Sequence, residues 1–295
     1  MKITTIGTDL AKEVFQIHGV DSCGKVLLRK QLRRNEMAKF FANIEPCLIG
    51  MEACGSAHHW ARQIGQYGHT VKLMAPQFVK PYVKTNKNDM ADAEAICEAV
   101  SRPSMRFVSV KNVEQQAILS VHRARQGFVK SRTAQANQIR GLLSEFGFVI
   151  PKGISSIAKR MPDILEDAEN GIPGTMRQLL QRLNNHLKEL DRQVDELEIQ
   201  IKQWHKESEA SLKLEAIPGI GPITASAIVA TVGNAMEYKS GRQLAAWLGA
   251  NAQTAFKRRQ ADIAGYQQAW RQLFANIADP WCTICCSSSR AQYRN

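Results

Sequence analysis

Four carboxylates in the first third of the chain have the types and the spacing needed for metal-assisted chemistry on phosphodiesters. Asp9 ends the first expected strand, and Glu52 follows the buried apolar run 47–51. Asp89 and Asp92 open a helical segment three residues apart, which places them on one face of that helix. Cleavage of a phosphodiester with Mg²⁺ requires several carboxylates that converge on two cations about 4 Å apart. We therefore predict that these four acids are the catalytic and metal-binding residues, with Mg²⁺ as the cofactor.

Each acid also has a purely structural interpretation. Asp9 can cap the turn at residues 10–12, and Asp89 and Asp92 can be first-turn acids that favour the helix dipole. Taken singly, each acid fits its structural role better than a catalytic one. Taken together, the order strand–Asp, strand–Glu, helix–Asp-x-x-Asp matches the ribonuclease H-like layout and favours a metal site.

The elements that must position these acids follow from the alternation of β-rich and helical runs. The first three runs have turn residues between them and predict a three-stranded meander. Later runs alternate between strand and helix, which predicts a mixed sheet with helices on its faces, an α/β domain over residues 1–110. The expected strands are 2–9, 13–20, 25–31, 47–51 and 70–74, and the expected helices are 35–44, 58–67 and 90–100.

Composition narrows the class of partner. The chain has 295 residues and a net charge of +12, so a polyanion, and nucleic acid first, is the expected partner. No apolar run reaches the length of about 18 residues that a membrane span needs. The polar Asp9 interrupts any signal peptide, and isolated cysteines are typical of a reduced compartment. We expect a cytoplasmic protein with no membrane contact.

Residues 113–146 form a long helical stretch with several cations. These cations can neutralise phosphates or simply form a solvated helix face. Its basic residues include His122, and the candidate nucleic-acid ligands among them are Arg123, Arg125, Lys130, Arg132 and Arg140.

Residues 176–204 carry an apolar seam with alternating spacings of four and three, typical of a coiled coil. The seam can be buried in a hairpin within one chain or in a contact between two chains. We expect a homo-oligomer, although the sequence does not decide between the two arrangements.

The segment 217–221 matches the core of a helix-hairpin-helix DNA-binding motif. Gly219 and Gly221 would let backbone N–H groups approach a phosphate at the start of the next helix, although a plain helix turn has the same pattern. His58 and His59 have no third ligand in range, so we interpret them as surface or packing residues.

Three segments that contain the four acids, 7–12, 51–55 and 87–96, resemble the DEDD signature of the IS one-ten family of insertion-sequence transposases, also called bridge-RNA recombinases. The resemblance runs from Lys2 to Gly249. It implies a RuvC-like domain over 1–110, long helices and a coiled coil over 111–209, and a small helical Transposase-20-type domain over 210–249. It also implies a non-coding guide RNA, a DNA substrate, and a C-terminal serine that bonds to DNA.

Residues 250–295 depart from the family pattern. The family continues with a Ser-Ser-Gly-Gly-Lys-like stretch that holds the nucleophile, but this chain has no serine between Ser240 and Ser287. Read one base forward from Ala250, the back-translated tail permits a sequence that contains Ser-Ser-Gly-Gly-Lys. We interpret the tail as an out-of-frame product and assign no nucleophilic serine.

An out-of-frame tail predicts low order beyond Gly249, with short helical pieces near 267–277. Cys282, Cys285 and Cys286 are followed by no second ligand pair, so we assign no zinc site to them.

Three functions follow from the residues and the resemblance. The first is a transposase that cuts and rejoins DNA. The second is a catalytically dead remnant that still binds DNA or RNA. The third is a RuvC-like structure-specific nuclease, which needs the four acids but no serine.

Overall fold

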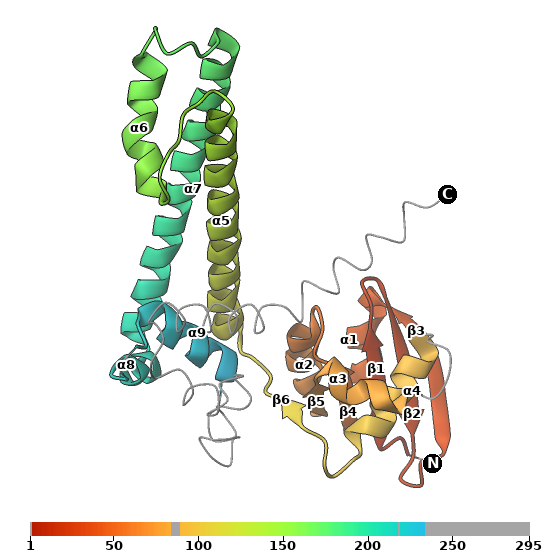
Figure 1. Ribbon diagram of the computed structural model, residues 1–295. Helices are drawn as coiled ribbons and strands as arrows, with labels where there is room; N and C mark the ends of the chain where they lie inside the picture. The colour runs from red at the N-terminus through yellow and green to blue at the C-terminus, as the bar shows by residue number, and fades with distance from the viewer. Residues whose placement is uncertain (1, 84–88, 218, 234–295) are drawn as a thin grey trace, which may run out of the picture. The chain divides into compact units, whose positions relative to one another are not determined.

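The computed structural model describes residues 2–83, 89–217 and 219–233 (Figure 1). The described chain divides into two compact units, one built on residues 1–112 and one on residues 113–232. The expectations for residues 250–295 lie outside the described residues.

A six-stranded sheet forms the centre of the first unit, in the order β3-β2-β1-β4-β5-β6. Strands β1, β2 and β3 pair antiparallel, as the predicted meander requires, whereas β1–β4 and β4–β5 are parallel and β5–β6 antiparallel. The predicted mixed sheet is therefore confirmed, and β6 is an addition to it. The strands are β1 (Thr5–Leu10), β2 (Val14–Val20), β3 (Val26–Arg33), β4 (Leu48–Glu52), β5 (Thr70–Met74) and β6 (Phe107–Val108).

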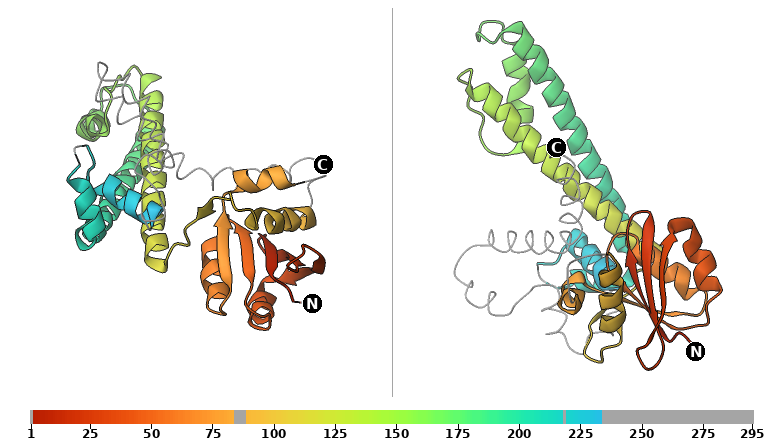
Figure 2. Two further views of the ribbon diagram at one scale, coloured as in Figure 1. Left: turned by 90° about the horizontal axis from the view of Figure 1, so that it is seen from below. Right: turned by 90° about the vertical axis from the view of Figure 1, so that its right-hand side faces the viewer.

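Helices cover both faces of this sheet (Figure 2, left). On one face α1 (Met37–Ala42) and α2 (Ala57–Gly65) bury their apolar sides against the strands. On the other face lie the short helix α3 (Pro76–Val79) and α4 (Asp89–Val100). Two short 3₁₀ turns, Arg34–Glu36 and Lys80–Tyr82, connect these elements. Each face therefore has its own buried core.

The second unit is helical. Helices α5 (Val113–Ser144) and α7 (Gly174–Glu207) run side by side, and α6 (Ile154–Glu166) packs beside them. Helices α8 (Glu209–Glu215) and α9 (Pro222–Val232) pack against α7 in the same unit. Most of the apolar seam of α7 is buried, including Leu180 and Val194. Helices α5, α6 and α9 of the same chain therefore bury residues of this seam.

Helix α6 was not among the predicted elements, and Pro162 lies inside it although proline disfavours a helix interior. Its buried residues Ile157, Met161 and Ile164 repeat with helical spacing, and their burial against α5 and α7 favours the helix despite the proline. In the described residues, no helix combines the length and the apolar character that crossing a membrane requires.

Candidate active site

Asp9 and Glu52 lie on the same face of the sheet, at the carboxyl ends of two neighbouring parallel strands. The register pairs Gly7 with Gly50 and Thr8 with Met51, so Asp9 and Glu52 occupy the next position along both strands. Successive side chains of a strand point to opposite faces. Thr8 and Met51 are fully buried on the face covered by α1 and α2, so the two half-buried acids belong to the face covered by α4.

Helix α4 packs on this face in direct contact with the strand backbones at two glycines. A Cβ atom on Gly7 would lie 2.2 Å from the carbonyl oxygen of Ala93 and 2.4 Å from the backbone nitrogen of Cys97. A Cβ on Gly50 would lie 2.7 Å from Cβ of Val100. Because these glycines are register partners on β1 and β4, they form one seat for the helix, which we call the glycine seat.

The direction of α4 over the glycine seat brings its first turn towards the carboxylates. Ala93 lies over Gly7, and the Cys97 thiol, one turn later, donates to the carbonyl of Thr5 at 3.8 Å. The helix thus runs back along β1, and its N-terminal residues lie towards the Asp9 end of that strand. Asp92 is half-buried in this first turn. The side chain of Asp89 lies outside the described residues.

The Cys54 thiol lies close enough to both Asp9 and Glu52 for their charges to act on it. Burial, with smaller contributions from the charges of Glu52 and Asp9, raises the pKa of Cys54 to about 12. The thiol is therefore neutral at pH 7 and is a poor ligand for a hard cation. The carboxylate oxygens of Asp9 and Glu52 are therefore the expected metal ligands beside this thiol.

These residues fit a magnesium ion by the chemistry of their donors, since Mg²⁺ binds through carboxylate oxygens and keeps several waters. Within the described side chains, which do not include that of Asp89, no three His, Cys, Asp or Glu groups approach closely enough to hold a metal ion. The assignment of the four acids remains a prediction that the strand register and the glycine seat support.

The candidate basic residues of α5 divide into two groups. Arg125 donates to Glu198 at 2.5 Å and Arg132 to Asp191 at 2.5 Å, and these partners all lie between α5 and α7. Arg140 donates to backbone carbonyls of residues 151 and 153, at the loop that follows α5. Arg123 and Lys130 are exposed. Arg125, Arg132 and Arg140 thus have structural roles. All five basic residues remain candidates for nucleic-acid contact.

The prediction that His122 is one of the cations of α5 is wrong. Its Nε2 lies 3.1 Å from the hydroxyl of Ser226 on α9. Burial, with a smaller contribution from the charge of Arg125, lowers the pKa of His122 to about 4. The imidazole is therefore neutral at pH 7.

The segment 217–221 lies between α8 and α9, as a hairpin between two helices requires. Gly219 has a positive φ of 88°, and Gly221 accepts a hydrogen bond from the backbone N–H of Ala225 in the first turn of α9. Phosphate contact at this turn remains a prediction.

His58 and His59 occupy the positions expected of packing and surface residues. His58 is buried, and its Nδ1 accepts a hydrogen bond from the backbone N–H of Lys111 at 3.2 Å. His59 is exposed and lies edge-on to the ring of Trp60.

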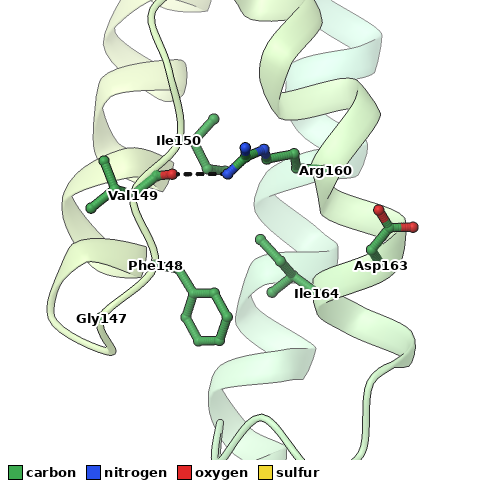
Figure 3. A pocket seen from close by; sticks show the side chains of 7 residues that line it. All are labelled: Gly147, Phe148, Val149, Ile150, Arg160, Asp163 and Ile164. Atoms are coloured by element: carbon green, nitrogen blue, oxygen red, sulfur yellow. Dashed lines mark hydrogen bonds between the residues drawn. The ribbon is translucent and has the colours of Figure 1, made fainter.

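A cavity of about 390 Å³ lies elsewhere, between the loop after α5 and helix α6 (Figure 3). Phe148 and Ile164 line it, and Arg160 donates to the carbonyl of Val149 at 3.2 Å. Asp163 is the single carboxylate among its lining residues, so the cavity lacks the paired acids that metal-assisted cleavage needs.

Comparison with known proteins defines the class to which this site belongs. A DEDD transposase family model matches residues 6–148, and a model described as the transposase IS116/IS110/IS902 family matches residues 211–294. The chain is 50% identical over 251 residues to a "Probable family 20 transposase" of Pseudomonas aeruginosa, covering 84% of this chain and 74% of the relative.

Two further relatives carry transposase names. The chain is 44% identical over 247 residues to the transposase for insertion sequence element IS1328 of Yersinia enterocolitica, and 40% identical over 247 residues to that for IS1111A of Coxiella burnetii. These matches cover 84% of this chain, and 73% and 68% of the relatives. The chain belongs to the IS116/IS110/IS902 family of transposases, enzymes that cut and rejoin DNA. Its mixed α/β unit is consistent with a DEDD nuclease-like fold.

The glycine seat was not predicted from the sequence. The available signal was a glycine in the middle of each of two buried strand runs, Ile6-Gly7-Thr8 and Ile49-Gly50-Met51, because such a glycine marks the close approach of another backbone.

Proposed function

We propose that this protein transposes an insertion sequence by metal-dependent cutting and rejoining of DNA strands. Asp9, Glu52, Asp89 and Asp92 are the proposed metal-binding carboxylates. The glycine seat is the observation that carries this proposal, because it holds α4 against β1 and β4 with the first turn of the helix on the Asp9 side of Gly7.

In this proposal the protein supplies rigid positions for charged oxygens. Asp9 and Glu52 end strands in the centre of the sheet, and the backbone contact at Gly7 limits movement of α4 and so of Asp92. When bound, Mg²⁺ would stabilise the charge on the phosphate and on the leaving oxygen. The neutral Cys54 thiol leaves these positions to oxygen donors.

Metal binding tests the carboxylate assignment independently of DNA cleavage. We expect Asp9→Asn to weaken Mn²⁺ binding to the full chain by about a hundredfold, measured by isothermal titration calorimetry at neutral pH. Glu45→Gln is the matched control, since Glu45 is an exposed carboxylate of the same unit that pairs with Lys2. Equal Mn²⁺ affinity of Asp9→Asn and the unaltered chain would contradict the assignment.

An alternative to this proposal is that residues 250–295 are out of frame and that this copy lacks the serine nucleophile, so that the protein binds nucleic acid without transposing. The shifted frame and the absence of serine between Ser240 and Ser287 support this. The family-model match, which extends to residue 294, weighs against it. Resequencing the gene across codons 248–260 decides between them: a one-base lesion supports the alternative, whereas stop codons or unrelated residues in the shifted frame refute it.

A non-coding guide RNA, a homo-oligomer and phosphate contacts from the α5 cations and from Gly219 and Gly221 complete the proposal. They rest on the family resemblance, the net charge of +12 and the basic residues of α5.

A further inference from the structure

The face of the sheet that carries Asp9 and Glu52 continues as a row of polar residues to the sheet edge. The register pairs Asp9 with Gln16 on β2, and Gln16 with Gln31 on β3. Glu52 occupies the corresponding position on β4. Register partners share one face, so these positions form a line across four strands, about 14 Å long at the usual strand spacing.

Two arginines lie beside the outer end of this row. Arg29 and Arg33 are two residues before and after Gln31 on β3, so they share its face. The orientation of Arg29 is confirmed by its ion pair with Glu94 of α4, at 3.5 Å. Lys30, between them, belongs to the opposite face, where its Nζ lies 5.6 Å from the ring centroid of Phe40.

The outer part of the row is accessible. Strand β3 is at the edge of the sheet, and Arg29, Gln31 and Arg33 are exposed, whereas Gln16 is half-buried. The ion pair of Arg29 is itself exposed, so exchanging the carboxylate of Glu94 for a phosphate has little energetic cost. Glu36 is also close to Arg33, since its side chain accepts the backbone N–H of Arg33 at 2.7 Å.

We propose that Gln16, Gln31, Arg29 and Arg33 bind the phosphodiester backbone of a single DNA strand and lead it to Asp9 and Glu52. Guanidinium and carboxamide groups donate hydrogen bonds to phosphate oxygens, and the exposed arginines match the negative charge of the strand. The occupant is DNA because the row ends at the carboxylates where the proposed function cuts DNA. This inference rests on that proposed function.

The test compares two faces of one strand. In the full chain, Arg29→Gln with Arg33→Gln removes two cations from the proposed DNA face, and Lys30→Gln removes one from the opposite face. Fluorescence anisotropy measures binding of a labelled single-stranded DNA of about 16 nucleotides at several salt concentrations. Each phosphate contact contributes about 0.7 to the slope of log affinity against log salt, so the double variant should lower the slope by about 1.4. Lys30→Gln should leave the slope unchanged.

Equal slopes for the double variant and the unaltered chain overturn the inference, as does an equal loss in Lys30→Gln. A loss confined to an RNA oligonucleotide of the same sequence also overturns it. Mn²⁺ calorimetry separates this failure from failure of the proposed function: unaltered Mn²⁺ binding in Asp9→Asn refutes the carboxylate site, whatever the double variant does. Thermal unfolding followed by circular dichroism checks that each variant is folded.

Discussion

Helix α4 of the first unit and helix α7 of the second are each held against a neighbour, but through different atoms. Helix α4 meets the sheet at Gly7 mainly through its own backbone, with the carbonyl oxygen of Ala93 and the backbone nitrogen of Cys97 nearest to the glycine. Helix α7 meets α5 through side chains, an apolar seam and the ion pairs Arg125–Glu198 and Arg132–Asp191. Side chains change rotamer and absorb small shifts, whereas a backbone contact has no adjustable atoms. We infer that precision is concentrated under α4, where the proposed carboxylates need it.

Gly7→Ala should have the largest effect on stability, because it disturbs the backbone contact between α4 and the sheet. The new methyl group would lie 2.2 Å from a backbone oxygen, so α4 must move or the fold must loosen. We expect a loss of about 3 kcal/mol or more in the free energy of unfolding, measured by urea denaturation, together with weaker Mn²⁺ binding. Gly65→Ala is the control, because nothing lies within 4 Å of a Cβ at that position. An unchanged free energy of unfolding in Gly7→Ala would mean that the contact is not close.

Gly50→Ala should be milder, because its new methyl group would lie 2.7 Å from Cβ of Val100, a smaller overlap than the 2.2 Å approach at Gly7. We expect a loss of about 1–3 kcal/mol in the free energy of unfolding. The double variant Gly50→Ala with Val100→Gly should lose less than the sum of the two single variants, since Val100→Gly removes the Cβ that the new methyl group meets. Additive losses in urea denaturation would refute the contact between Gly50 and Val100.

His122 provides a pH test of packing in the helical unit. Its pKa falls from 6.5 to about 4 on folding, so the unfolded chain binds more protons between these values. Stability is therefore highest above pH 6.5 and falls as the pH drops towards 4. Because the imidazole is part-buried, we expect about 1–2 kcal/mol of the loss to depend on it. Urea denaturation at pH 7 and pH 5 should show a smaller difference in His122→Asn, and an identical difference would contradict burial of a neutral His122.

The smallest expected effect is that of Arg125→Gln, which removes one partner of a part-buried pair between α5 and α7. We expect about 1 kcal/mol of destabilisation, because the remaining Glu198 is left without its guanidinium partner. Arg192→Gln is the matched control, since the ion pairs of Arg192 among the described residues, with Glu189 and Glu196, lie within α7 on an exposed surface. Thermal unfolding should show no measurable change in this control; equal losses would mean that the α5–α7 pair has no special role.

Local patterns were sufficient to predict the sheet, because alternation and turn residues are properties of the sequence itself. The expected strand 70–74 coincides with β5, and the expected helix 90–100 differs from α4 by one residue at its start. Tertiary contacts were not predictable in this way. His122 is neutral because it is buried, and its Nε2 lies beside the hydroxyl of Ser226, which is 104 residues away along the chain. Helix α6 persists around Pro162 because α5 and α7 bury its apolar side.

The predictable part of the candidate site was the residue types, and the unpredictable part was what holds them together. Asp9 and Glu52 could be chosen because each lies at the end of an expected strand. Their common face depends on the parallel register of β1 and β4, and the approach of α4 depends on the glycine seat, neither of which local sequence determines.

Four carboxylates around the end of β1 are the proposed ligands of the catalytic metal. Anomalous diffraction from crystals of the chain grown with Mn²⁺ tests this assignment most directly. We predict an anomalous peak within bonding distance of carboxylate oxygens of Asp9, Glu52 and the first turn of α4. A fully occupied Mn²⁺ site elsewhere, with no peak beside Asp9, would contradict the account.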